Sequence, residues 1–188
     1  MKRLFVAVSI IPSDELRKKC IWLQQQLSRE KISWVDAVNI HITLRFFGET
    51  PEEKIPKINV ALSKATQGIN GLELVVKGCG IFGSRHSPGV IWLGIMENEY
   101  FRHLYEKVTR ELTKIGYAPD RQNFVPHITM GRVKKKLVDL QKFQEVIGRL
   151  RDMYFQTSEV NELILFESIL RKLGPEYHIV SSFSLAGK

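Results

Sequence analysis

Two short segments of the sequence carry almost the same four residues. Positions 41–44 read HITL and positions 127–130 read HITM, and together they use two of the chain's five histidines. An imidazole has an ordinary pKa of about 6.5, so it can donate or accept a proton near neutral pH. A threonine hydroxyl two positions later can donate a hydrogen bond to an oxygen that gains negative charge. The two segments therefore predict a site that moves protons and holds an anion.

That set of groups suits the cleavage of a phosphodiester without a metal ion. In-line displacement at phosphorus requires a base on the incoming oxygen and an acid on the leaving oxygen, on opposite sides of the phosphorus. A single His-x-Thr would more readily be explained as ordinary strand sequence with a hydrogen-bonded histidine. Two nearly identical copies in similar contexts favour the catalytic interpretation.

Both segments lie in stretches rich in β-branched and apolar residues, which predicts strands. Side chains alternate between the two faces of a strand, so the histidine and the threonine of each motif share one face. The apolar residues between them then point into a core. Two such strands facing each other would form a cleft that contains two imidazoles and two hydroxyls.

The elements around the motifs alternate irregularly. The patterns predict strands over 3–9, 40–47, 72–82, 89–95, 125–131 and 177–185, one long strand or a pair of strands over 153–170, and helices over 12–30, 51–68, 98–115 and 139–151. Thr50-Pro51-Glu52-Glu53 has the form of a capping box for the second helix. Because helices do not follow every strand, the sequence predicts an α+β fold with antiparallel sheets, and a single domain of two lobes over residues 1–188.

Four further residues are candidates for contact with the substrate. Arg132 follows the second motif and could bind phosphate, but strict alternation places it opposite His127 unless a bulge at Gly131 turns it round. Arg45 shares the face of the first motif by the same alternation, and a solvated arginine is the alternative. Phe5 and Trp92 lie in strands, where they could stack on a base or pack in the core.

The charge of the chain favours an anionic partner. It has 28 Lys and Arg against 20 Asp and Glu, a formal net charge of +8, and nucleic acid is the commonest partner of such proteins. The run Lys134–Lys136 is interpreted as a solvated turn, with a weak contact to an RNA backbone as the alternative.

Several classes of site and location are disfavoured. The sequence has no metal-ligand spacing of His or Cys and no glycine-rich phosphate loop, so we expect neither a metal nor a cofactor. Cys20 and Cys79 fall in a helix and a strand pattern, as buried thiols of a reducing compartment would, and we expect a cytoplasmic protein. No apolar stretch is long enough to span a bilayer, and the apolar residues after Arg3 are interpreted as a strand and not as a targeting signal.

The chain resembles the 2H phosphoesterases, which carry two His-x-Thr/Ser motifs, and within them the RNA 2′,3′-cyclic phosphodiesterases, also called 2′-5′ RNA ligases. The resemblance rests on the two motifs and on the blocks RLFVAVSI, NIHITLRFFGE, GVIWLGI, FVPHITMGR and SILRKLGPEYHIV. It implies two pseudo-symmetric lobes, each an antiparallel sheet backed by helices, with the cleft between them. It also implies that His41 gives a proton to the leaving 3′ oxygen and His127 activates water, while Thr43, Thr129 and Arg132 bind the phosphate.

The expected activity is hydrolysis of an RNA 2′,3′-cyclic phosphate end to a 2′-phosphate, by a monomer, together with reversible 2′-5′ RNA ligation. Two alternatives remain open. One is a phosphodiesterase for a small cyclic nucleotide or an ADP-ribose cyclic phosphate, and the other is an RNA-binding module without catalysis. The presence of both histidines and both threonines argues against loss of catalysis, and the positive charge favours RNA over a small substrate. The physiological RNA is not readable from the sequence.

Overall fold

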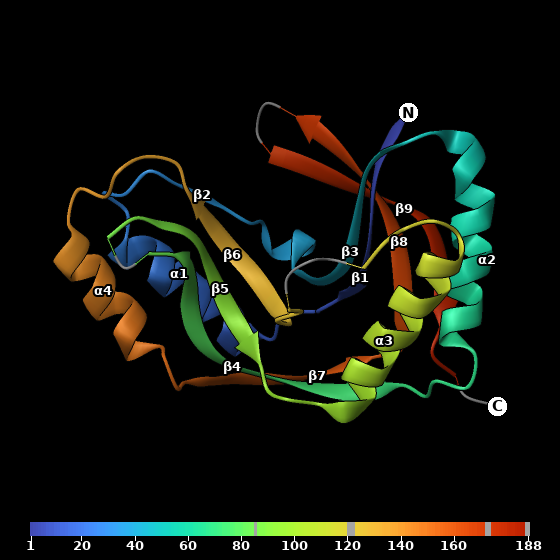
Figure 1. The fold of residues 1–188 in the computed structure, drawn as a ribbon. Helices are drawn as coiled ribbons and strands as arrows, with labels where there is room; N and C mark the ends of the chain where they lie inside the picture. Colours follow the sequence, from blue (N-terminus) through green and yellow to red (C-terminus); the bar gives the residue numbers. More distant parts are fainter. Residues whose placement is uncertain (85, 120–122, 172–173, 187–188) are drawn as a thin grey trace.

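The computed structural model describes residues 1–84, 86–119, 123–171 and 174–186 (Figure 1). Positions 172–173, inside the last block that carries the family resemblance, lie outside these residues. In chain order the elements are β1 (Lys2–Ser9), α1 (Asp14–Gln26), β2 (Ile32–Trp34), the 3-10 turn η1 (Ala37–Asn39), β3 (His41–Thr50), the 3-10 turn η2 (Glu52–Lys54), α2 (Ile55–Thr66), β4 (Leu72–Gly83), β5 (Pro88–Ile95), α3 (Glu99–Lys114), β6 (His127–Val133), α4 (Leu140–Arg149), β7 (Tyr154–Val160), β8 (Glu162–Arg171) and β9 (Gly174–Ser184).

Three of the four helices begin at a polar side chain that caps them. Ser13 Oγ accepts from the Leu16 amide at 3.2 Å, and Asn98 and Asp139 cap α3 and α4 in the same way. The capping box predicted at Thr50 is wrong. Thr50 is the last residue of β3, its hydroxyl donates to the Gly48 carbonyl at 3.1 Å, and η2 comes before α2.

The strands form one antiparallel sheet in the order β7-β4-β5-β6-β3-β1-β8-β9, and β2 also pairs with β6. The centre of this sheet is narrow. β3 and β6 share a single residue pair, Ile42 opposite Ile128. Further along the same edge of β6, residues Gly131–Val133 pair with β2 instead. The sheet therefore divides into two halves that diverge from Ile42 and Ile128.

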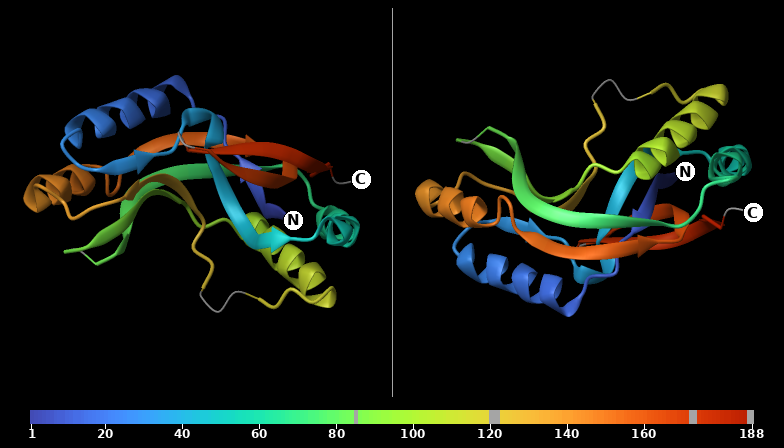
Figure 2. Two further views of the ribbon diagram at one scale, coloured as in Figure 1. Left: turned by 90° about the horizontal axis from the view of Figure 1, so that it is seen from above. Right: turned by 90° about the horizontal axis from the view of Figure 1, so that it is seen from below.

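Each half of the sheet carries its own helices and forms a lobe. We call β1, β3, β8 and β9 with α2 and α3 the first lobe, and β2, β4, β5, β6 and β7 with α1 and α4 the second lobe. Figure 2 shows α1 and α3 on opposite sides of the curled sheet. The α+β class with two sheet-and-helix lobes, predicted from the sequence, is confirmed.

Alternation along β1 separates two packing environments. Leu4, Val6 and Val8 are fully buried in the main core, which continues through both lobes. Phe5 and Ala7 point the other way and form a smaller cluster with residues of β8 and β9. Because β1 pairs with β3 so that Ser9 lies opposite His41 and Ala7 opposite Thr43, this second face also carries the first motif.

Candidate active site

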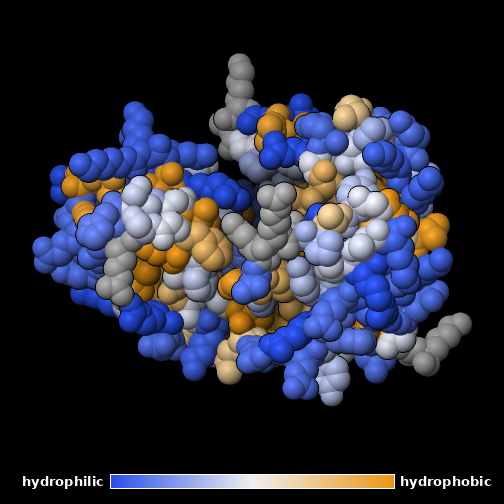
Figure 3. Space-filling view, viewed as in Figure 1, coloured by the Kyte–Doolittle hydropathy of each residue, from blue (hydrophilic) through white to orange (hydrophobic). Residues whose placement is uncertain are grey.

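The two motifs meet at the centre of the molecule. Each histidine is the first residue of its strand, and the isoleucine that follows it is fully buried. With Ile42 opposite Ile128, the antiparallel register places His41 next to the position of Thr129 and Thr43 next to that of His127. Figure 3 shows the surface hollowed between the two lobes in this view, with apolar side chains on both sides of the hollow.

Both imidazoles are oriented by the same local hydrogen bond. His41 Nδ1 lies 2.6 Å from the carbonyl oxygen of Asn39, and His127 Nδ1 lies 2.8 Å from that of Val125, in each case two residues earlier in the chain. A carbonyl oxygen only accepts, so Nδ1 carries the hydrogen and donates it. Nε2 is then the nitrogen left for substrate chemistry, and in His41 it lies 3.0 Å from Thr43 Oγ1.

The surroundings of the two histidines favour their neutral forms. Burial is the main cause that lowers the pKa of His41, and the nearby His127 and Arg132 lower it further, while the bond to Asn39 acts in the opposite direction. Burial also lowers the pKa of His127, helped by Arg132 and opposed by the bond to Val125.

Aromatic rings surround His41. Phe5, Phe46, Phe166 and Tyr177 form a cluster in which Phe5 and Tyr177 have their ring centroids 5.0 and 5.3 Å from that of His41. Phe5 is 2% exposed, so the structure places it beneath the imidazole as packing. Phe46 is 61% exposed and Tyr177 is half-buried, so these two rings, which the sequence did not single out, present surface beside His41.

His127 is bordered by the aromatic side chains Phe82 and Trp92. The Phe82 ring meets the His127 ring edge-on with centroids 4.8 Å apart, and it lies 5.3 Å from the Trp92 ring. Trp92 pairs with Thr129 across β5 and β6 and covers Gly80, where a Cβ would lie only 2.3 Å from the indole. Trp92 is therefore a half-buried part of the wall next to the second motif.

A bulge in β6 turns Arg132 towards the histidines. Thr129 lies opposite Trp92 but Gly131 lies opposite Ile91, so Met130 is an extra residue in β6. Met130 and Val133 both pack against the main core although they are three positions apart, an odd spacing that the bulge permits. The exposed Arg132 therefore lies on the same face of β6 as His127. Its charge acts on both histidines and on Tyr177.

A bulge in β3 has the opposite effect on Arg45. Ala7 lies opposite Thr43 but Val6 lies opposite Arg45, so Leu44 is an extra residue in β3. After this bulge Arg45 lies on the opposite face of the strand from Thr43. Arg45 Nη2 donates to the carbonyl oxygen of Ala118, in the segment after α3. The structure thus brings Arg132 to the two motifs and directs Arg45 away from them.

The described residues show no group of side chains suited to bind a metal ion, and both cysteine thiols are unreactive at neutral pH. Among them, no three or more His, Cys, Asp or Glu side chains lie together as ligands of an ion would. Burial raises the pKa of Cys20 to about 11 and that of Cys79 to about 12. In the described part of the chain, no helix combines the length and apolarity that crossing a bilayer requires.

A pocket of about 330 Å³ lies where β1 ends and β7 leads into β8, and its lining includes Ser9, which pairs with His41 across β1 and β3. The lining also includes Glu159 and Glu162, with Ser182 and Ser184. Two carboxylates would repel a phosphate. This pocket is therefore a poor site for an anion.

Comparison with known proteins identifies relatives that span the whole chain. The model of the family described as "LigT like Phosphoesterase" matches twice, over residues 10–92 and 93–177. A protein of Archaeoglobus fulgidus is 35% identical over 178 residues, covering 93% of this chain and 96% of its own length. One from Methanothermobacter thermautotrophicus is 32% identical over 185 residues, covering 97% and 98%. Both are named RNA 2′,3′-cyclic phosphodiesterase.

Solved structures share the fold. TT0787 of Thermus thermophilus superposes with a TM-score of 0.80 over 99% of both chains, at 24% identity. The apo form of LigT from E. coli gives a TM-score of 0.74 over 98% of both chains, also at 24% identity.

Proposed function

Because this chain belongs to the LigT-like phosphoesterase family, we propose that it hydrolyses the 2′,3′-cyclic phosphate at the end of an RNA strand and leaves a 2′-phosphate. The observation that carries the proposal is the meeting of two identically oriented imidazoles, each held by a carbonyl two residues earlier, at the junction of the lobes. The names of the relatives supply the substrate class.

The two histidines divide the proton transfers between them. His127, neutral at Nε2, takes a proton from a water molecule as the water oxygen attacks phosphorus. The bond from phosphorus to the 3′ oxygen breaks, and protonated His41 gives its Nε2 proton to that oxygen. The 2′ oxygen keeps the phosphate, and exchange with solvent restores both histidines. In ligation the 5′ hydroxyl of another RNA end takes the place of the attacking water: His127 removes its proton, its oxygen bonds to phosphorus, and the 3′ oxygen leaves with the proton from His41, which gives a 2′-5′ phosphodiester.

The remaining polar groups hold the phosphate. Thr43 and Thr129 donate hydrogen bonds to its non-bridging oxygens, and Arg132 supplies a planar guanidinium with several donors. The rings of Phe46 and Tyr177 offer a surface on which the terminal base stacks, while Phe5 supports His41 from below. We assign residues 1–188 to one catalytic domain that acts as a monomer in the cytoplasm.

A direct test uses a short RNA that ends in a 2′,3′-cyclic phosphate, incubated with the protein in excess EDTA. We expect full turnover and a product whose phosphate is on the 2′ hydroxyl, because protein side chains carry both proton transfers. The position of the phosphate is read by nuclear magnetic resonance of phosphorus. Loss of activity in EDTA that a divalent ion restores would overturn the metal-free mechanism, and a 3′-phosphate product would reverse the assignment of the leaving oxygen.

The pH dependence of kcat/KM should be a bell with its maximum below pH 6.5. Raising the pH removes the proton that His41 must give, and lowering it blocks His127, so the rate falls on both sides. The pKa values of both histidines are lowered from the ordinary value of 6.5. Both limbs of the pH profile, which report the free enzyme, therefore lie at a lower pH than those of ordinary histidines. Rates measured from pH 4 to 9 at low substrate concentration test this, and a maximum well above pH 7 would contradict it.

A further inference from the structure

Four exposed lysines lie together at the end of β6 that is remote from the histidines. We call Lys31, Lys134, Lys135 and Lys136 the basic cluster. Lys31 directly precedes β2 and comes to this cluster because the Lys134 amide donates to the Lys31 carbonyl oxygen at 2.8 Å, which continues the pairing of β2 with β6. All four side chains are exposed. The run 134–136 lies exposed between β6 and α4, and Lys31 adds a fourth lysine beside it.

A buried carboxylate holds the segment in place. Glu30 is 9% exposed, and its two oxygens accept from the amides of Val138 at 2.8 Å and Asp139 at 3.0 Å. Asp139 in turn caps α4 by accepting from the Lys142 amide at 2.9 Å. These bonds fix the backbone on both sides of the lysines, so an anion bound there would order less of the chain.

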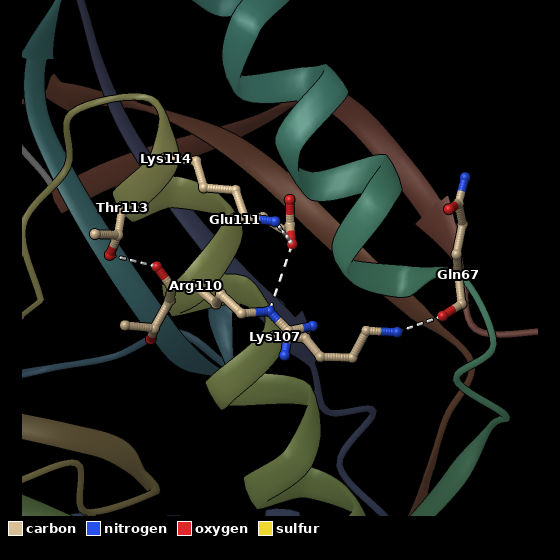
Figure 4. Close-up of polar contacts among 7 residues, drawn as sticks. Gln67, Lys107, Arg110, Glu111, Thr113 and Lys114 are labelled. Carbon is tan, nitrogen blue, oxygen red and sulfur yellow. Dashed lines mark hydrogen bonds and ion pairs between the residues drawn. The ribbon is translucent and has the colours of Figure 1, made fainter.

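In the part of the chain that the structure describes, the lysines of the basic cluster form no ion pair with a carboxylate, in contrast to Arg110 and Lys114 of α3. On α3, Glu111 pairs with Lys114 at 2.6 Å and Arg110 at 3.5 Å, and Lys107 donates to the Gln67 carbonyl (Figure 4). Lys2, Lys18, Arg102 and Arg171 also have carboxylate partners. Within the described residues, no lysine of the basic cluster forms an ion pair. Four like charges are thus kept side by side, which costs free energy unless an anion binds them.

Arg132 connects the basic cluster to the histidines. β6 begins at His127 and ends at Val133, a length of about 20 Å at the usual rise of a strand. Arg132 lies next to this end and pairs with Ser33 of β2, yet its charge reaches both histidines. Positive charge therefore extends in a line from the junction of the motifs to the outer end of the second lobe.

From this placement we infer that the basic cluster binds backbone phosphates of the RNA strand on the 5′ side of the cyclic phosphate. The inference rests on the proposed function, which places the 3′ end of the strand between the two histidines. A row of cations leading away from that point matches a linear polyanion, whose next phosphates follow the terminal nucleotide. The preferred substrate is thereby an oligonucleotide several nucleotides long, because a mononucleotide makes none of these contacts.

The test compares two triple variants on a long and a short substrate. K134A/K135A/K136A removes three charges from the basic cluster, and K54A/K57A/K64A removes three exposed lysines from η2 and α2, on the far side of the first lobe. For a ten-nucleotide RNA with a 2′,3′-cyclic phosphate, we expect KM to rise roughly tenfold in the first variant only, and the salt dependence to weaken by a slope of about 0.7 per lost contact. For 2′,3′-cyclic UMP, kcat and KM should stay unchanged in both.

A binding measurement separates this inference from the proposed function. Fluorescence anisotropy of a labelled ten-nucleotide RNA that ends in a 2′-phosphate reports affinity without turnover. Equal losses of affinity in the two triple variants, or none in either, would refute a specific site at the basic cluster. If the first variant alone loses affinity but the unsubstituted protein cleaves neither cyclic substrate, the basic cluster stands and the hydrolytic function falls.

Discussion

Replacing His41 or His127 with alanine is expected to lower kcat/KM for an RNA cyclic phosphate by about 10²–10⁴-fold, the usual worth of a positioned general acid or base. The loss follows from the geometry, since each imidazole has its Nδ1 occupied by a backbone carbonyl and its Nε2 left for the substrate. Steady-state kinetics measure the effect. The thermal unfolding midpoint should change little for His127→Ala, because that side chain is only partly buried.

His103→Ala provides a matched control, because His103 is an exposed histidine of α3 and should leave the kinetics unchanged. The residual activity of each active-site variant carries a second prediction. Loss of His127 should abolish the acidic limb of the pH profile, and loss of His41 the alkaline limb. If the limbs disappear in the opposite order, the acid and the base are exchanged; if both persist, other groups transfer the protons.

Replacing Arg132 with alanine should lower kcat/KM by about 10²–10³-fold, the cost of removing one donor to a developing oxyanion. The same variant should move both limbs of the pH profile to higher pH, because Arg132 lowers the pKa of both histidines and its removal lets them rise. This upward shift distinguishes a cation at the site from a residue that only supports the fold.

Two further substitutions sharpen the test of Arg132. Arg132→Lys keeps the charge and should therefore keep the pH profile, while it loses the planar bidentate contact and recovers only part of the rate. Arg149→Ala removes an exposed arginine of α4 and should have no effect. An Arg132→Ala variant with unchanged kcat/KM would place the phosphate out of reach of this side chain.

The pairing of the two motifs was predictable from the sequence because it depends only on local alternation. His41 and Thr43 share a face, as do His127 and Thr129, and the isoleucine between them is buried in both strands. The strands themselves follow from their β-branched and apolar residues. Three helix starts also follow from local chemistry, since Ser13, Asn98 and Asp139 cap them directly.

The surroundings of the motifs were less predictable because they depend on bulges and on distant segments. One extra residue in each strand, Leu44 and Met130, reverses the alternation, so that Arg132 turns towards the site and Arg45 away from it. Gly131 was a usable signal for the second bulge. It also admits β2, since a Cβ there would lie 2.8 Å from Ile32 Cγ2. Tyr177 reaches His41 from β9 at the other end of the chain, and no local pattern announces such a contact.

The two repeats do not coincide with the two lobes. The family model divides the chain between residues 92 and 93, inside β5, yet β1 and β3 share the first lobe with β8 and β9, and α1 of the first repeat packs on β7 of the second. Each lobe is thus assembled from both halves of the chain. Neither half of the chain could therefore complete a lobe alone, since each lobe needs strands from both halves. Because β3 belongs to the first half and β6 to the second, the two motifs come together at Ile42 and Ile128 only when both halves of the chain have folded on one another.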